Sequence, residues 1–234
     1  MSFQGKNILI VGASSGIGLS VAKLLQAEGA HLFTASRRIP PGIQSHHVVW
    51  DVTQPSNGIF GSLPDTLHGL VYTPGTIQLK PFQRFSLNDF RHDFEINVLG
   101  AIDTIQAHLN RLKKANGASV VLFSTVAVQT GMGFHSSIAV AKGAIEGLTR
   151  SLAAELAPAK IRCNAVAPSL TDTPLAASLL ATEEKREASD KRHPLGRIGT
   201  TQDIAAAAKF LLSDEGGWIT GQIIGIDGGM GRLK

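Results

Sequence analysis

A histidine and a lysine two helical turns apart are the residues of this chain whose types and spacing could do chemistry. The stretch GFHSSIAVAK, residues 133–142, places His135 seven positions before Lys142, with Ile138 between them. If one helix covers the stretch, the three share a face and about 10 Å of helix axis separates His135 from Lys142. Imidazole, with a reference pKa of about 6.5, exchanges protons readily at neutral pH. The spacing suits two groups that reach opposite ends of one ligand, although His135 could instead only end a loop or cap the helix.

A glycine-rich turn near the N-terminus is typical of a phosphate-binding site. VGASSGIGLS follows an apolar run and opens a segment of helical period, with Gly12, Gly16 and Gly18 in the turn. Glycine lets the backbone turn tightly and approach a pyrophosphate, whose charge then meets free N–H groups at the helix N-terminus. Such a turn can also serve only to pack a helix on a strand. A second strand about 20 residues further on favours the dinucleotide interpretation.

The end of that second strand indicates which dinucleotide binds. FTASRR carries Ser36 and Arg37 where a carboxylate would bind a ribose 2′-hydroxyl. A guanidinium beside a hydroxyl suits a 2′-phosphate, which it binds through charge-assisted bidentate hydrogen bonds. NADP(H) is therefore favoured over NAD(H), unless Arg37 and Arg38 are only a solvated pair on a loop. Asp51, directly after HHVVW, could accept a hydrogen bond from an adenine amino group or could cap a turn.

Strands and helices that alternate along the chain must position these residues. Strand-like runs lie at 7–11, 30–35, 46–50, 69–73, 118–124, 160–168 and 222–227, and segments of helical period lie at 17–29, 87–114 and 135–157. This alternation predicts βαβ units and a parallel sheet covered on both sides. We therefore predict one α/β domain over residues 1–234, a Rossmann-like, doubly wound parallel sheet with helices on both faces.

The least regular region, residues 173–199, is predicted to be a substrate flap. Two prolines and two glycines bracket a helix that is expected to carry Leu175, Leu179 and Leu180 on one side. A long connection after the carboxyl end of a strand is where a flap would lie. A plain surface excursion is the alternative.

Composition excludes several other classes of function. The formal charge of the chain is only +4, and its basic residues are interleaved with acidic ones, as in 182–192. Only 6% of residues are aromatic, so the composition argues against nucleic-acid binding. No run of 18 apolar residues exists and MSFQGKNILIVG leaves no room for a leader, so we expect a cytoplasmic protein without a membrane partner. Cys163 is expected to be a buried strand residue. No metal site is predicted.

Together these motifs resemble the short-chain dehydrogenase/reductase family, over essentially the whole chain. VGASSGIG resembles its glycine motif, with Val11 in place of threonine, and Asp51–Val52 resembles its adenine-contacting pair. IRCNAVAPSLTDT resembles the strand and loop that reach the nicotinamide, with Ser169 where glycine is usual. WITGQIIGIDGG is similar to the closing strand that helps to build the family's tetramers. The resemblance implies a nicotinamide-dependent oxidoreductase acting on a small molecule, assembled as a homotetramer or dimer.

The resemblance also implies a catalytic set, from which the chain departs. In the family a tyrosine four residues before the lysine exchanges a proton with the substrate oxygen, and here that position is Ile138. Thr125 stands where a serine orients that oxygen, and Asn97 matches the asparagine that holds a water near the lysine. Lys142 matches the lysine that hydrogen-bonds the nicotinamide ribose. His135 is the candidate that replaces the tyrosine, because Tyr72, the one tyrosine of the chain, is expected under the adenine half.

These motifs predict two sets of site residues and leave three classes of function open. The catalytic set is Lys142, Thr125, Asn97 and His135. The cofactor set is Gly12, Ser14, Ser15, Gly16, Ile17, Gly18, Ser36, Arg37, Asp51, Val52, Gly75, Lys142, Pro168, Thr171 and Thr173. The favoured function is an NADP(H)-dependent oxidoreductase with an atypical active site, acting on a carbonyl or an activated double bond. A non-catalytic NADP(H)-binding sensor or partner subunit, and a module for some other ligand, are the alternatives.

Overall fold

A seven-stranded parallel sheet forms the centre of the computed structural model, which describes residues 2–233. Its strands lie in the order β3-β2-β1-β4-β5-β6-β7, and every neighbouring pair is parallel. They are β1 Asn7–Val11, β2 His31–Ser36, β3 Ser45–Val49, β4 Gly69–Tyr72, β5 Ser119–Phe123, β6 Arg162–Pro168 and β7 Ile223–Ile226. The order reverses between β1 and β4, so the sheet is doubly wound, as predicted.

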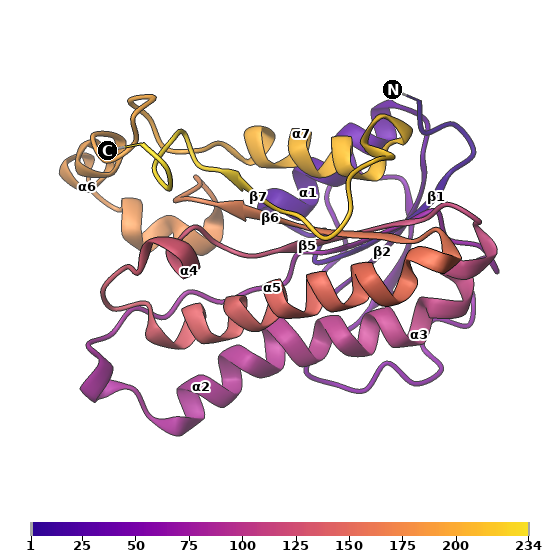
Figure 1. Cartoon of the computed structure of the whole chain (residues 1–234), viewed down its shortest axis with the longest axis horizontal. Helices are drawn as coiled ribbons and strands as arrows, with labels where there is room; N and C mark the ends of the chain where they lie inside the picture. Colours follow the sequence, from indigo (N-terminus) through magenta and orange to yellow (C-terminus); the bar gives the residue numbers. More distant parts are fainter. Residues whose placement is uncertain (1, 234) are drawn as a thin grey trace.

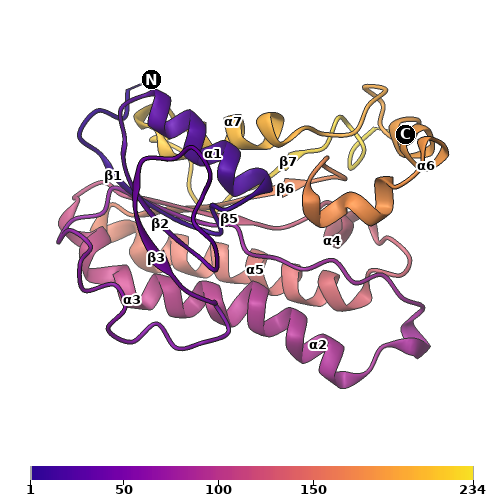
Figure 2. The ribbon, with the colours of Figure 1, turned by 180° about the vertical axis from the view of Figure 1, so that it is seen from behind.

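Helices cover both faces of the sheet (Figure 1 and, from behind, Figure 2). Helices α1 (Gly16–Ala27) and α7 (Thr201–Leu212) pack together on one face. Helices α3 (Gly100–Lys114) and α5 (Ser136–Leu156) cover the other, and α2 (Leu87–Phe94) packs against α5.

Side chains of successive strand residues enter opposite cores, because they point to opposite faces of the sheet. In β1, Leu9 and Val11 lie in the core that also contains Ile145 of α5. Ile8 and Ile10 lie in the core that contains Ile204 of α7. Cys163 of β6 is completely buried, as the sequence predicted.

The helical segment after β4 is interrupted where the sequence predicted one helix over 87–114. A π-helix, Glu95–Leu99, joins α2 to α3. Single π turns are frequent at functional sites. This one contains Asn97, whose side chain is completely buried.

Several further helices complete the chain. They are α4 Ala127–Thr130, α6 Glu183–Asp190 and 3-10 helices at Phe82–Arg84, Ala157–Ala159, Pro174–Leu180 and Asp214–Gly216. The expectation that Leu175, Leu179 and Leu180 share one helix side is wrong. They lie on the tighter 3-10 helix before α6, where Leu175 is half exposed and Leu180 is buried. Among residues 2–233, no helix is both long and apolar enough to cross a membrane.

Candidate functional site

A cavity of about 320 Å³ lies beyond the carboxyl ends of β4, β5 and β6. Parallel strands end at the same edge of a sheet, which is where ligands bind in open α/β folds. Thr125, His135, Ile138 and Lys142 line the cavity. The predicted catalytic residues therefore come together, apart from Asn97, which lies behind the cavity wall.

Lys142 is the most strongly perturbed group of the cavity. Lys142 is only 8% exposed, and this burial lowers the pKa of its ammonium group from 10.5 to about 8. The negative charge of Asp93 acts in the opposite direction and raises that pKa in part. A lysine held this way is poised between its charged and neutral forms in weakly alkaline solution.

Asn97 and Lys142 meet across Gly75. The Asn97 amide Nδ2 donates to the Asp93 carbonyl at 2.7 Å and to Thr76 Oγ1 at 3.0 Å. Its Oδ1 is buried and has no hydrogen-bond partner among the described residues. A methyl group built on Gly75 would lie 3.3 Å from Asn97 Oδ1 and 3.7 Å from Lys142 Nζ. An acceptor and a donor thus face one small space that only glycine leaves open.

A buried carboxylate behind the cavity was not predicted from the sequence. Asp93, on α2, is completely buried and accepts hydrogen bonds from Ser137 Oγ at 2.6 Å, Thr76 Oγ1 at 2.7 Å and Gln78 Nε2 at 3.3 Å. Three donors offset much of the cost of burying this charge. An aspartate on the helix face that carries Asn97, four residues later, was the signal available in the sequence.

His135 precedes helix α5 and does not belong to it. The helix begins at Ser136, so Ile138 and Lys142 share a helix face while His135 occupies the N-cap position. Its side chain makes no capping hydrogen bond to the described helix. Its Nδ1 lies 2.6 Å from the carbonyl oxygen of Gly133. Because a carbonyl only accepts, Nδ1 carries a proton and Nε2 is the nitrogen left for a ligand.

A second cavity, of about 550 Å³, adjoins the first along the ends of β1 and β2. Residues 12, 14–18, 36, 37, 51, 52, 75 and 173 of the predicted cofactor set line it, whereas Lys142, Pro168 and Thr171 line the first cavity. Ile17, Gly75 and Thr173 line both. One extended ligand could therefore occupy the two cavities together.

The glycine turn fits a phosphate group. Gly12 and Gly16 have φ angles of +88° and +55°, which side-chain-bearing residues rarely adopt. A Cβ on Gly18 would collide with the carbonyl of Gly12. Ser15, at the N-cap of α1, makes no side-chain cap to the described helix, so the first N–H groups of α1 are available to an anion.

Arg37 is the exposed cation at the far end of this second cavity. Its side chain is 79% exposed, and Nη1 lies 4.0 Å from Asp51 Oδ2. Ser36 Oγ donates to the Arg38 carbonyl at 2.8 Å, so Arg37 is left as the donor for a phosphate. Asp51 caps a turn, since its Oδ1 accepts from Thr53 N and Oγ1 at 3.0 and 2.9 Å. These bonds to Thr53 are the main reason why its pKa is lowered.

Tyr72 cannot stand in for the missing tyrosine. Its hydroxyl donates to the Ile96 carbonyl at 2.5 Å, and it lines neither cavity. Burial raises the pKa of the phenol far above its usual value. Tyr72 therefore lies outside both cavities, in agreement with the expectation that it does not replace the tyrosine.

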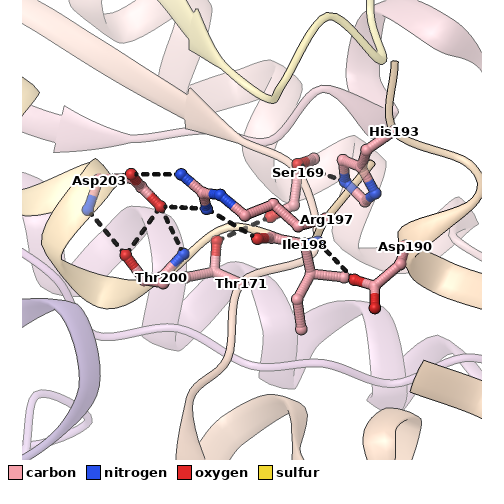
Figure 3. A network of polar contacts seen from close by, with 8 residues as sticks. All are labelled: Ser169, Thr171, Asp190, His193, Arg197, Ile198, Thr200 and Asp203. Carbon is pink, nitrogen blue, oxygen red and sulfur yellow. Dashed lines mark hydrogen bonds and ion pairs between the residues drawn. The ribbon is translucent and has the colours of Figure 1, made fainter. Parts of the chain in front are cut away.

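A second histidine, His193, was also missed by the sequence analysis. It lies in segment 173–199 and contacts Ser169 in the wall of the first cavity (Figure 3). The same segment contributes Leu175 and Leu179 to that wall, so it borders the first cavity. A lone histidine in a loop follows no sequence pattern. The one available signal was its partner Ser169, which stands where the resemblance implies a glycine.

Comparisons with known proteins extend over nearly the whole chain. A family model described as enoyl-(acyl carrier protein) reductase matches residues 12–231. The chain is 32% identical to tropinone reductase homolog At2g29290 of Arabidopsis thaliana, over 98% of this chain and 94% of that protein.

Solved structures with either nicotinamide cofactor are similar to it. A protein of Beutenbergia cavernae assigned as an NAD(P)-dependent gluconate 5-dehydrogenase, with NADP bound at low occupancy, superposes with a TM-score of 0.91. It is 27% identical, over 98% of both chains. The 3-ketoacyl-(acyl-carrier-protein) reductase of Brucella melitensis, complexed with NADH, gives 0.87 at 25% identity, over 98% of this chain and 100% of that one.

Proposed function

Because the chain belongs to the short-chain dehydrogenase/reductase family, we propose that it is an NADP(H)-dependent oxidoreductase with an atypical active site. It transfers hydride to or from a small carbonyl or alcohol, or an activated enoyl substrate. The observation that carries the proposal is the adjoining pair of cavities, with Lys142 Nζ against the Gly75 that borders both. The fit of the glycine turn to a phosphate and the exposed Arg37 support the choice of cofactor.

Each part of the chain has a proposed role. The glycine turn and the N-terminus of α1 bind the pyrophosphate, and Arg37 binds the 2′-phosphate. Lys142 holds the nicotinamide ribose, and Asn97 holds a water near Lys142. The bound cofactor supplies or accepts hydride. Thr125 orients the substrate oxygen, and His135 contacts the substrate through Nε2 and can exchange a proton with it. Ile138 contributes an apolar contact only.

Arg37→Glu is expected to weaken NADPH binding about 10²-fold, because a charge-assisted pair worth roughly 1.5–3 kcal/mol becomes a repulsion. NADH binding is expected to change little, since NADH has no 2′-phosphate. Titration followed by nicotinamide fluorescence measures both. Arg38→Glu is the matched control, because it makes the same charge change one residue away. Equal losses for NADPH and NADH would contradict the assignment of Arg37.

His135→Ala is expected to lower turnover about tenfold or more while leaving NADPH affinity unchanged. The reason is that His135 lines the first cavity, proposed as the substrate cavity, and does not line the second, proposed as the nucleotide cavity. Steady-state rates over a panel of carbonyl and enoyl substrates, with NADPH titrations, measure the two effects separately. His31→Ala, at the exposed start of β2, controls for loss of any histidine. Equal turnover in wild type and His135→Ala would remove this residue from the mechanism.

A non-catalytic NADP(H)-binding protein is the second candidate function. Ile138 favours it, because an apolar side chain lines the cavity where the family's tyrosine would exchange a proton. Sustained NADPH oxidation with a defined substrate, in proportion to protein concentration, would exclude this candidate. Failure to bind either nicotinamide cofactor would exclude both.

We further propose a cytoplasmic homo-oligomer, either a dimer or a tetramer. Several large apolar side chains are exposed, among them Leu99 of the π-helix and Val140 of α5, and Trp218 before β7 is completely exposed. Apolar surface of this kind is covered in protein interfaces. Light scattering would show a monomer mass of 24.7 kDa if the proposal is wrong.

A further inference from the structure

Ser169 and His193 form a hydrogen-bonded pair in the wall of the substrate cavity (Figure 3). His193 Nε2 lies 2.8 Å from Ser169 Oγ, and Nδ1 lies 2.7 Å from the Ser189 carbonyl oxygen. Because that carbonyl only accepts, Nδ1 carries a proton in every state of the ring. The neutral ring therefore accepts from the Ser169 hydroxyl through Nε2, and the protonated ring donates to it.

The polypeptide around His193 is anchored at several points. His193 is only 3% exposed. Asp190 Oδ1 accepts from Ile198 N at 2.7 Å, and Arg197 binds both carboxylate oxygens of Asp203 at 2.7 and 2.9 Å (Figure 3). Thr171 pairs with Gly199 in a parallel bridge. A buried imidazole with both nitrogens engaged has one orientation, which a group that relays protons requires.

Among the described residues that line the cavity, no other hydroxyl is hydrogen-bonded to an imidazole. Ile138 carries no proton. Ser124 Oγ donates to Glu146 at 2.8 Å, but an ionised carboxylate only accepts. His135 is held through one nitrogen only, at the less buried start of α5. Imidazole is the side chain that exchanges donor and acceptor roles near neutral pH.

We propose that Ser169 and His193 form a proton relay that takes the part of the absent tyrosine; this inference rests on the proposed oxidoreductase function. In reduction, hydride adds to the carbonyl carbon while the C=O π bond breaks toward oxygen. That oxygen takes the proton of the Ser169 hydroxyl, and Ser169 takes the Nε2 proton of the protonated His193. His193 is left neutral, with its proton on Nδ1. Oxidation of an alcohol runs through the same steps in reverse.

Ser169→Ala and His193→Gln are each expected to lower turnover about 10²-fold, at the lower end of the range for general acid catalysis, while NADPH affinity stays unchanged. Ala removes the hydroxyl. Gln keeps a hydrogen-bonding group of similar reach that cannot take up a proton. Ser169→Thr is expected to keep most of the activity, because it keeps a hydroxyl. A purely structural role of Ser169 would not distinguish Thr from Ala in this way.

NMR of the cofactor-free protein with isotope-labelled histidine gives a test that does not depend on turnover. The neutral His193 ring is expected to carry its proton on Nδ1, and the Nε2 resonance is expected to shift in Ser169→Ala. A proton found on Nε2 of the neutral ring would overturn the relay.

The outcomes separate this inference from the proposed function. Wild-type turnover with unchanged rates in Ser169→Ala and His193→Gln would overturn the relay and leave the oxidoreductase standing. A loss of turnover seen in His135→Ala but in neither Ser169→Ala nor His193→Gln would also overturn the relay and leave the oxidoreductase standing. Tight NADPH binding without turnover on any substrate would overturn both.

Discussion

Lys142→Met is expected to stop turnover and, at neutral pH, to raise the free energy of unfolding by roughly 2–3 kcal/mol. The folded chain lowers the pKa of this lysine from 10.5 to about 8 by burying it. Each pKa unit corresponds to about 1.4 kcal/mol, so the charged form is penalised by roughly 3 kcal/mol at low pH. Methionine fills a similar volume without the charge. The net shift already includes the opposing attraction to Asp93, so that attraction is not subtracted again.

The pH dependence of this gain has a defined sign. Between about pH 8 and pH 10.5 the unfolded chain holds the Lys142 proton and the folded chain does not. Wild-type stability therefore rises with pH in that window, and the advantage of Lys142→Met falls away across it. Denaturant titrations at a series of pH values measure this. Lys113→Met, at an exposed position of α3, is the control and is expected to show no such trend. A variant less stable than wild type at pH 7 would contradict the argument.

Ile138→Tyr is expected to restore turnover to Ser169→Ala by about 10²-fold, the loss expected from Ser169→Ala and the lower end of the range of general acid catalysis. Position 138 lies one helical turn before Lys142, and its side chain lines the cavity. A tyrosine there places a phenol beside the lysine and no longer needs the relay. In the wild-type background the gain is expected to be smaller, since the relay already supplies the proton.

The control for this experiment is Ile138→Phe in the same Ser169→Ala background. It adds the same ring without the hydroxyl, so it reports any effect of reshaping the cavity. Turnover numbers for the two double variants, measured at saturating NADPH, give the contribution of the hydroxyl alone. Equal rates would show that position 138 does not reach the substrate oxygen.

The seven strands could be predicted because most are short, apolar runs with β-branched residues between turns, although β3 is largely polar and partly exposed. Helix α7 was missed, although Thr200 and Asp203 form a capping box at its start. Its run of four alanines has little contrast between a buried and an exposed face. The π-helix around Asn97 was also missed, because its altered hydrogen-bonding register leaves the apolar pattern of the segment almost unchanged.

Some residues of the candidate site could likewise be predicted from the sequence, and others could not. Residues of the glycine turn and of the strand ends could be placed together, because parallel strands deliver their carboxyl ends to one edge. Asp93 and His193 could not, since the burial of a polar side chain depends on partners distant in sequence, here Ser137 and Ser169. His135 could be found by its spacing from Lys142, but the point at which α5 begins depends on tertiary structure.

The shared wall of the two cavities has a thermodynamic consequence. Ile17, Gly75 and Thr173 border both spaces, so a molecule in either one changes the surface offered to a molecule in the other. The two binding equilibria are therefore linked. By whatever factor the nucleotide alters the affinity for the second ligand, the second ligand alters the affinity for the nucleotide by the same factor.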